Sequence, residues 1–172
     1  MKKKSLTHDL TLYTFSRYPY TRKRPTSKRY EVTIGVGGNI GNMRQRFQRL
    51  LRYFAQHPSV TILATAPCLE NPPFGFTDQP PFLNTIIVVK TDLPPFPFLK
   101  FLMHTEKKFG RRRSFKNGPR TLDLDIIFFE TKVMYNEQLI IPHPHWQSRA
   151  SVLIPLGYLT QPQRFLRYQG AV

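Results

Sequence analysis

The spacing of apolar residues in the first half of the chain predicts a strand, a helix and a second strand. Val32, Ile34 and Val36 alternate with other residues, which is typical of a strand because its side chains point to opposite faces in turn. Between 42 and 56 the apolar residues recur at helical spacing, and the segment opens with an asparagine that can cap a helix. Residues 60–66 have the composition of a further strand.

The second half repeats this order. A near-continuous β-branched run at 84–91 predicts a central strand, and apolar residues between 98 and 109 predict a second helix. Residues 122–128 alternate strictly between apolar and other side chains, as a half-buried strand does. One face of that strand is expected to carry Leu122, Leu124, Ile126 and Phe128.

The order strand, helix, strand, strand, helix, strand predicts an α+β ferredoxin-like sandwich. Two β-α-β units would form one antiparallel sheet, with the helices packed on it. Residues 133–141 look like a short hairpin arm, and 152–159 like a closing helix or strand. We expect residues 31–172 to form this domain, because 172 residues with 40% apolar content suffice for one proper core.

Charge sets the first 30 residues apart. The formal net charge is +16, and residues 1–30, with nine Lys or Arg and a single acid, carry half of it. This N-terminal arm is expected to be either an extra edge strand between residues 10 and 20 or a flexible basic tail without a catalytic role. It has no apolar core of a secretory signal, although its composition resembles that of a transit peptide. A balance this basic suits phosphate-rich partners.

Two further features narrow the class of protein. A single cysteine, Cys68, excludes a disulfide framework and a cysteine-based zinc site, and it fits a reducing compartment. No apolar run approaches the roughly 18 to 20 residues that cross a bilayer. We therefore expect a cytoplasmic protein without a membrane partner.

The candidate chemistry centres on residues 106–129. Asp123 and Asp125 share one face of the predicted strand, with their carboxylates starting roughly 6 to 7 Å apart. That spacing suits Mg²⁺, which prefers carboxylate and water oxygens and would relieve the repulsion between the two side chains. The preceding stretch, 106–120, holds seven Lys or Arg against one acid. Cations and forked guanidiniums together predict a polyphosphate site. The alternative is a solvated basic loop before a strand with two surface aspartates.

Other segments carry weaker signals. The glycines of 35–41 miss the dinucleotide-binding spacing, so we interpret this segment as a tight turn between strand and helix. The loop at 71–84 combines four prolines with aromatics and amides, which suits a flat heterocycle but also suits a rigid connector. His143 and His145 lack an evident third metal ligand nearby, so a metal site there is discounted.

The central segment G-R-R-R followed by G-P-R-T-L-D-L-D-I resembles the signature of the 6-hydroxymethyl-7,8-dihydropterin pyrophosphokinases of folate biosynthesis. The resemblance extends over about residues 31–160. It implies transfer of pyrophosphate from ATP to the hydroxymethyl group of the pterin, with release of AMP. It also implies small-molecule partners, two Mg²⁺ ions as cofactors, and no nucleic acid; we expect a monomer.

The same resemblance implies roles for individual residues. Asp123 and Asp125 would hold the two Mg²⁺ ions. Catalytic charge stabilisation would come from Arg111, Arg113 and Arg120. ATP would be bound by Glu106, Arg113, Arg120, His143 and Arg149. The pterin would be bound by Asn71, Pro72, Phe74, Phe82, Asn84 and Phe115. Asn117 stands where a common family form has Trp, and Phe115 is the candidate to supply the missing ring.

Two other classes of function remain open. A nucleic-acid-binding domain would use the basic arm and the aromatics, but these aromatics cluster with Pro and Asn instead of alternating with basic residues. A two-metal nuclease would share the paired aspartates, but it would usually call on more acids than the nine outside the arm. Release of AMP that depends on ATP separates both classes from the pyrophosphokinase.

Overall fold

The computed structural model describes residues 1–111 and 118–159, and its central sheet has the predicted order of elements. The elements of this unit are β4 (Tyr30–Gly38), α1 (Met43–Gln56), β5 (Val60–Thr65), β6 (Cys68–Asn71), β7 (Phe82–Thr91), α2 (Pro95–Lys108) and β8 (Asp123–Phe129). Strands β5 and β6 follow each other along the same side of β7, so they act as one interrupted strand. The predicted strand-helix-strand-strand-helix-strand order is confirmed.

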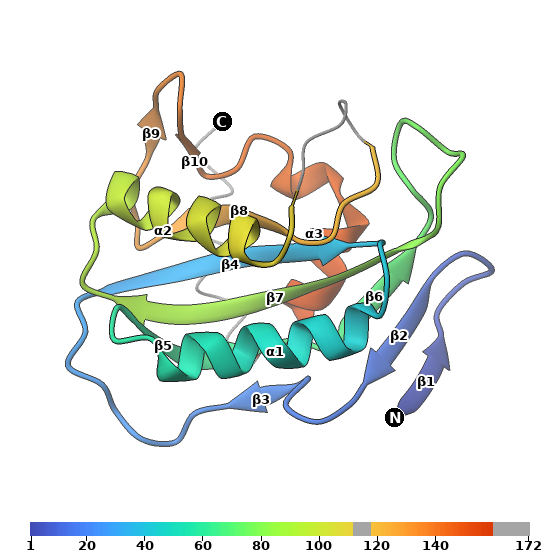
Figure 1. Cartoon of the computed structure of the whole chain (residues 1–172), viewed down its shortest axis with the longest axis horizontal. Coiled ribbons are helices and arrows are strands. Elements are labelled where there is room, and N and C mark those ends of the chain that lie inside the picture. The colour runs from blue at the N-terminus through green and yellow to red at the C-terminus, as the bar shows by residue number, and fades with distance from the viewer. Residues whose placement is uncertain (112–117, 160–172) are drawn as a thin grey trace.

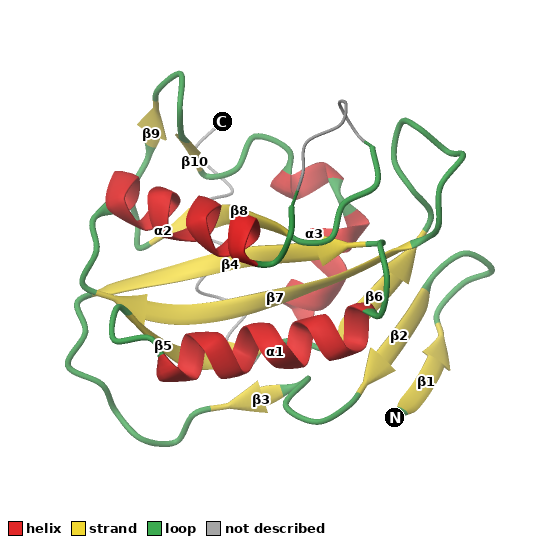
Figure 2. Ribbon diagram, viewed as in Figure 1, coloured by secondary structure: helices red, strands yellow, loops and turns green. Residues whose placement is uncertain are grey.

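The sheet places β4 and β7 at its centre. Its order is β1-β2-β6-β7-β4-β8, with β5 on β7 and β3 on β5, and every pairing in the described part of the chain is antiparallel. Helices α1 and α2 lie side by side on one face, and α3 (Ala150–Gly157) lies on the other (Figure 2). This is the α+β sandwich that the sequence predicts.

Local signals explain where the helices begin. Asn42 caps α1, because its side-chain oxygen accepts a hydrogen bond from the backbone N–H of Gln45 at 3.0 Å. Helix α2 starts three residues earlier than predicted, at Pro95. Proline fits the first turn because the first N–H groups of a helix have no partner within it. The closing segment, left open between helix and strand, is the helix α3.

The strict alternation predicted for β8 is wrong at its end. A register shift against β4 between Thr33 and Ile34 inserts a β-bulge. Leu124 and Ile126 therefore pack under α1 and α2, whereas Phe128 packs on the other face with Trp146, their ring centroids 5.0 Å apart. A bulge reverses the faces because one extra residue changes the two-residue period.

The remaining elements close the two ends of the sandwich. Strands β9 (Met134–Tyr135) and β10 (Ile140–Ile141) form the short hairpin predicted for 133–141, which stands beside the start of α2 (Figure 1). A 3-10 turn, η1 (Trp146–Ser148), leads into α3. No helix among the described residues is both long and apolar enough to cross a membrane.

The N-terminal segment is part of the sheet. Strands β1 (Lys2–Ser5) and β2 (Thr11–Thr14) form a hairpin beside β6, and β3 (Tyr20–Thr21) pairs with β5 (Figure 1). Between them Tyr18 is completely buried, and its hydroxyl donates a hydrogen bond to the carbonyl of Phe47 in α1 at 3.1 Å. Residues 1–21 therefore contribute to the main core.

Candidate active site

Glu106 stands at the C-terminal end of α2, where it reaches the outer edge of β8. The residue is 6% exposed. Its carboxylate accepts a hydrogen bond from the backbone N–H of Leu124 at 2.7 Å and forms an ion pair with Arg111. Burial raises the pKa of Glu106, and the nearby charge of Asp123 adds to this, while the Leu124 N–H and Arg111 oppose it. This residue is a buried link between helix and strand, not a surface ion pair.

Two guanidinium groups hold the carboxylate of Asp123. Arg111 Nη1 lies 2.7 Å from Oδ1, and Arg120 Nη1 lies 2.6 Å from Oδ2. Both arginine side chains are mostly buried, at 15% and 23% exposed, so these charge-assisted bonds are poorly screened by solvent. Glu106, Arg111, Asp123 and Arg120 thus form one connected carboxylate–guanidinium network.

Asp125 lies next to this network and has no partner of its own within residues 1–111 and 118–159. Its carboxylate makes no hydrogen bond or ion pair with any described residue, and its pKa is raised to about 7, first by burial and then by the charges of Asp123 and Glu106. Arg149 and Arg111 oppose the shift without cancelling it. A carboxylate this unfavourable as a free anion is a strong candidate to bind a cation.

Glycines on the neighbouring strand lie opposite both aspartates. Gly37 pairs with Asp123 and Gly35 with Asp125 across β4 and β8. A Cβ added at Gly35 would come within 3.1 Å of Ile127, and one at Gly37 within 2.4 Å of the side-chain oxygen of Asn84. The side chains of Ile127 and Asn84 therefore lie over these glycines, next to the aspartates, and a side chain at either glycine would displace one of them.

Asn39 joins three loops at the edge of this site. Its amide nitrogen donates to Gln79 Oε1 at 2.9 Å and to the carbonyl of Pro80 at 3.0 Å, and its oxygen accepts from the backbone N–H of Arg120 at 2.9 Å. Asn39 is 6% exposed, so these three bonds are protected from water. It links the turn after β4 both to the loop after β6 and to the segment that presents Arg120. The preceding Gly38 has no space for a side chain, since a Cβ there would lie 2.8 Å from the carbonyl of Thr121.

The residues predicted to bind a pterin come together only in part. Asn84 donates through Nδ2 to Asn71 Oδ1 at 2.7 Å, and the guanidinium of Arg120 lies 5.3 Å from the ring centroid of Phe82. The contact of Phe82 with Arg120 places these predicted residues next to the arginine network. Pro72 is exposed, and Phe74 is 83% exposed on the tip of the loop, so neither lines an enclosed cavity.

His143 and Arg149 approach the aspartates from the segment after β10. The pKa of His143 is lowered to about 4, mainly by burial and then by the charges of Arg149 and His145. Its Nδ1 accepts a hydrogen bond from the backbone N–H of His145 at 3.1 Å, which leaves the proton of the neutral ring on Nε2. Arg149, exposed at the start of α3, acts on the pKa values of both His143 and Asp125, so it lies within electrostatic reach of each.

Not every predicted site residue can be placed. Arg113 and Phe115 lie outside the described residues. Sequence reasoning missed three others: Asn39, Gly35 and Gly37. The available signal was that glycines two residues apart fall on the same face of a strand, which the interpretation of this segment as a tight turn overlooked.

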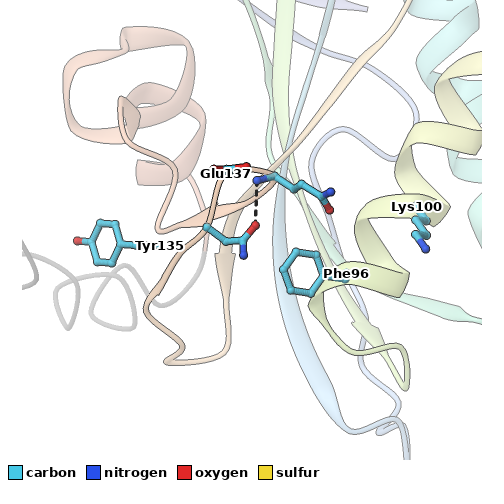
Figure 3. A pocket seen from close by; sticks show the side chains of 6 residues that line it. Phe96, Lys100, Tyr135 and Glu137 are labelled. Atoms are coloured by element: carbon cyan, nitrogen blue, oxygen red, sulfur yellow. Dashed lines mark hydrogen bonds between the residues drawn. The ribbon is translucent and has the colours of Figure 1, made fainter.

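A separate hollow of about 680 Å³ lies at the other end of α2. It is lined by Phe96, Lys100, Tyr135, Asn136, Glu137 and Gln138. Phe96 and Lys100 come from the first turns of α2 and the others from the β9–β10 hairpin (Figure 3). It contains none of the predicted site residues, so it plays no part in the site described above.

The chain is similar to known proteins over most of its length. Residues 33–161 match the family model of 7,8-dihydro-6-hydroxymethylpterin-pyrophosphokinase (HPPK), a span that contains both aspartates, Asn39 and every described arginine of the network. The chain belongs to the HPPK family. An enzyme of Campylobacter jejuni named 2-amino-4-hydroxy-6-hydroxymethyldihydropteridine pyrophosphokinase is 39% identical over 142 residues, which cover 83% of this chain and 90% of the relative. Enzymes of the same name from Helicobacter pylori and Bacillus subtilis are each 38% identical, covering 81% and 74% of this chain and 87% and 77% of theirs.

The HPPK family match does not extend over the N-terminal strands. It begins at Thr33, inside β4, so strands β1, β2 and β3 lie before it. The matched span contains helices α1, α2 and α3, most of the central sheet and the candidate active site, and β2 and β3 pair with strands that lie within it.

Proposed function

We propose that this protein transfers the pyrophosphoryl group of ATP to 6-hydroxymethyl-7,8-dihydropterin, giving the pterin diphosphate and AMP in folate biosynthesis. The observation that carries the proposal is the buried network of Glu106, Arg111, Asp123 and Arg120 beside Asp125, whose carboxylate has no hydrogen-bond or ion-pair partner among the described residues. Membership of the HPPK family supports the choice of substrates, since the relatives are named for this reaction.

The reaction makes one bond and breaks another at a single phosphorus atom. The hydroxymethyl oxygen attacks the β-phosphorus of ATP, and the bond from that phosphorus to the oxygen bridging the α-phosphate breaks. The hydroxyl proton leaves to solvent, and AMP departs with the bridging oxygen. Because negative charge develops on the departing AMP, fixed positive groups near the β-phosphate lower the barrier.

Arg111 and Arg120 are assigned the role of binding the phosphates of ATP. In the structure both guanidiniums bind Asp123. When ATP enters, the phosphate oxygens compete for these forked donors, and the arginines exchange part of their bonding from Asp123 to the phosphates. Arg113 is assigned the same role from its position in the motif. Glu106 keeps Arg111 in place throughout, because it is buried and also fixed by the Leu124 N–H.

Asp123 and Asp125 are assigned the two Mg²⁺ ions. They fit this role because both are carboxylates, one lies two residues after the other on β8, and Asp125 has no other partner among the described residues. No described group of three or more His, Cys, Asp or Glu side chains forms a larger metal centre, so water and phosphate oxygens would complete the coordination. Bound there, the ions would polarise the β-phosphorus and neutralise charge on the phosphates.

The pterin is assigned to the side of the sheet that carries Asn84. The carboxamide of Asn84 offers a donor and an acceptor, and its orientation is set by the bond to Asn71. Phe82 supplies an aromatic ring directly under Arg120, so the heterocycle would lie next to the phosphates. Pro72 and Phe74 are assigned to the rim of the pterin site. Phe115 is assigned the aromatic ring that stacks on the other side of the pterin from Phe82.

His143 and Arg149 are assigned the far end of the ATP phosphates. With its proton on Nε2 and a pKa lowered to about 4, His143 is a neutral hydrogen-bond donor at physiological pH. Arg149 supplies a positive charge from the start of α3, where it already acts on Asp125. These two groups would orient the phosphates and not take part in proton transfer.

The test is to incubate the purified protein with ATP, Mg²⁺ and 6-hydroxymethyl-7,8-dihydropterin and to identify the nucleotide products. AMP that appears in step with pterin diphosphate is expected. ADP would show simple phosphoryl transfer and contradict attack at the β-phosphorus. An absence of pterin-dependent turnover would contradict the function itself.

A further inference from the structure

Strand β2 of the N-terminal segment is connected to the proposed substrate site by a row of paired residues across the sheet. Cross-strand pairing places Leu12 opposite Leu69, Leu69 opposite Asn84, Asn84 opposite Gly37, and Gly37 opposite Asp123. Directly paired residues point to the same face of a sheet, with Cβ atoms about 5 Å apart. One row of side chains therefore runs from the N-terminal hairpin through the candidate pterin residue to the candidate metal ligand.

The middle of this row depends on β6. Strand β6 has only four residues, Cys68–Asn71, and it lies between β2 and β7. Its last residue, Asn71, accepts the 2.7 Å hydrogen bond from Asn84 Nδ2. Without β2, β6 would be a four-residue strand held along one edge only, and such strands fray at low cost. The position of Asn71 therefore rests on contacts from both sides of β6.

The contacts from β2 are built into the fold. Leu12 is 4% exposed and faces the fully buried Leu69, and the hydroxyl of Tyr13 donates to the carboxylate of Glu70, one residue before Asn71, at 3.3 Å. Farther along the segment, Phe15 and Tyr18 are buried in the main core. The outer strand β1 is different: in the part of the chain that the structure describes it pairs with β2 alone, and its side chains are exposed.

We propose that β2 is a positioning element for the pterin substrate: it holds β6 so that Asn71 fixes the side-chain amide of Asn84. Leu12 is the main positioning residue and Tyr13 the secondary one. The inference rests on the proposed function, and it adds to the reaction a segment that the family match does not include. A loss of β2 contacts should affect binding of the pterin and not of ATP. This is because β2 borders the Asn84 side of the sheet, whereas the arginine network is held by α2 and β8.

The test compares substitutions in the full-length chain. Leu12→Ala is expected to raise KM for the pterin about five- to tenfold and to change KM for ATP less than twofold. Leu12→Met, which conserves side-chain volume, should restore the wild-type value. Tyr13→Phe removes only the bond to Glu70, keeps the ring, and should raise the pterin KM about twofold. Tyr13→Phe also tests the positioning role of β2 if the Leu12→Ala protein folds poorly.

Leu139→Ala is the matched control. Leu139 is 7% exposed, similar to Leu12, but lies next to the β9–β10 hairpin. Its loss should lower stability without separating the two KM values. If Leu139→Ala and Leu12→Ala raise both KM values equally, the effect is general destabilisation and the inference is wrong.

A second measurement is independent of catalysis. In the wild-type protein the side-chain NH₂ of Asn84 should give a resolved amide signal in ¹H–¹⁵N spectra, and Leu12→Ala should shift or broaden it. An Asn84 signal that does not change in Leu12→Ala would overturn the positioning role. So would an unchanged pterin KM in a Leu12→Ala protein whose β6 amides exchange faster than those of the wild type. If the wild-type protein forms no AMP with the pterin, the proposed function fails instead, and the Asn84 signal still decides whether β2 positions this residue.

Discussion

Replacing Asn39 by Asp should uncouple the loops around the candidate active site while changing a single side-chain group. The carboxylate can still accept the N–H of Arg120, but it places an oxygen where Nδ2 donated to Gln79 and to the carbonyl of Pro80. The Gln79 amide could rotate to donate to this oxygen, but its own nitrogen already donates to the carbonyl of Phe76 at 2.6 Å. At least one bond is lost whichever way the amide turns.

The magnitude follows from these contacts. Two hydrogen bonds at about 1 kcal/mol each, plus the cost of a buried carbonyl left facing an oxygen, lower the free energy of unfolding by about 2–4 kcal/mol. For a chain of this size that corresponds to a fall in Tm of roughly 5–15 °C. Because Asn39 holds both the loop after β6 and the backbone of Arg120, KM for the pterin should rise and kcat should fall together.

The assay combines urea unfolding with steady-state kinetics in which each substrate is varied in turn. Asn136→Asp is the matched control. Asn136 is exposed on the β9–β10 hairpin, and among the described residues only its side-chain oxygen forms a side-chain hydrogen bond, accepting the N–H of Gln138 at 3.0 Å. It should leave stability and kinetics nearly unchanged. An Asn39→Asp protein with wild-type stability and kinetics would refute the role of these three hydrogen bonds.

Three further outcomes are expected. Asp123→Asn and Asp125→Asn should each lower kcat by about two orders of magnitude or more. In the absence of Mg²⁺, the Asp125→Asn protein should unfold at the same urea concentration as the wild type or at a higher one, because the raised pKa of Asp125 indicates that its buried anion is unfavourable. Wild-type turnover in either variant would contradict the metal assignment. Gly37→Ala should raise the pterin KM, since its Cβ would lie 2.4 Å from the Asn84 side-chain oxygen; an unchanged pterin KM would show that Asn84 does not contact the pterin. The thiol of Cys68, which is fully buried and whose pKa is raised mainly by burial, should react with a disulfide reagent only on unfolding, and rapid reaction of the native protein would show that β6 opens.

The candidate site was predictable to the extent that its residues are close in sequence. Asp123 and Asp125 share a face because strands have a two-residue period, and the density of arginines before them needs no tertiary information. The buried environment of Glu106 was not predictable, because it depends on α2 ending against the edge of β8. The role of Asn39 was hidden for the same reason: its partners lie 40, 41 and 81 residues away.

Local periodicity and capping by themselves determined the order of elements, the start of α1 at Asn42 and the pairing of two carboxylates on one strand. The tertiary structure alone decided which face Phe128 occupies, because a β-bulge depends on register with β4 and not on the pattern of β8. It also decided that a segment with the composition of a solvated basic tail enters the core through Tyr18. Such outcomes depend on contacts between distant segments, whose free energies appear only when the sheet brings them together.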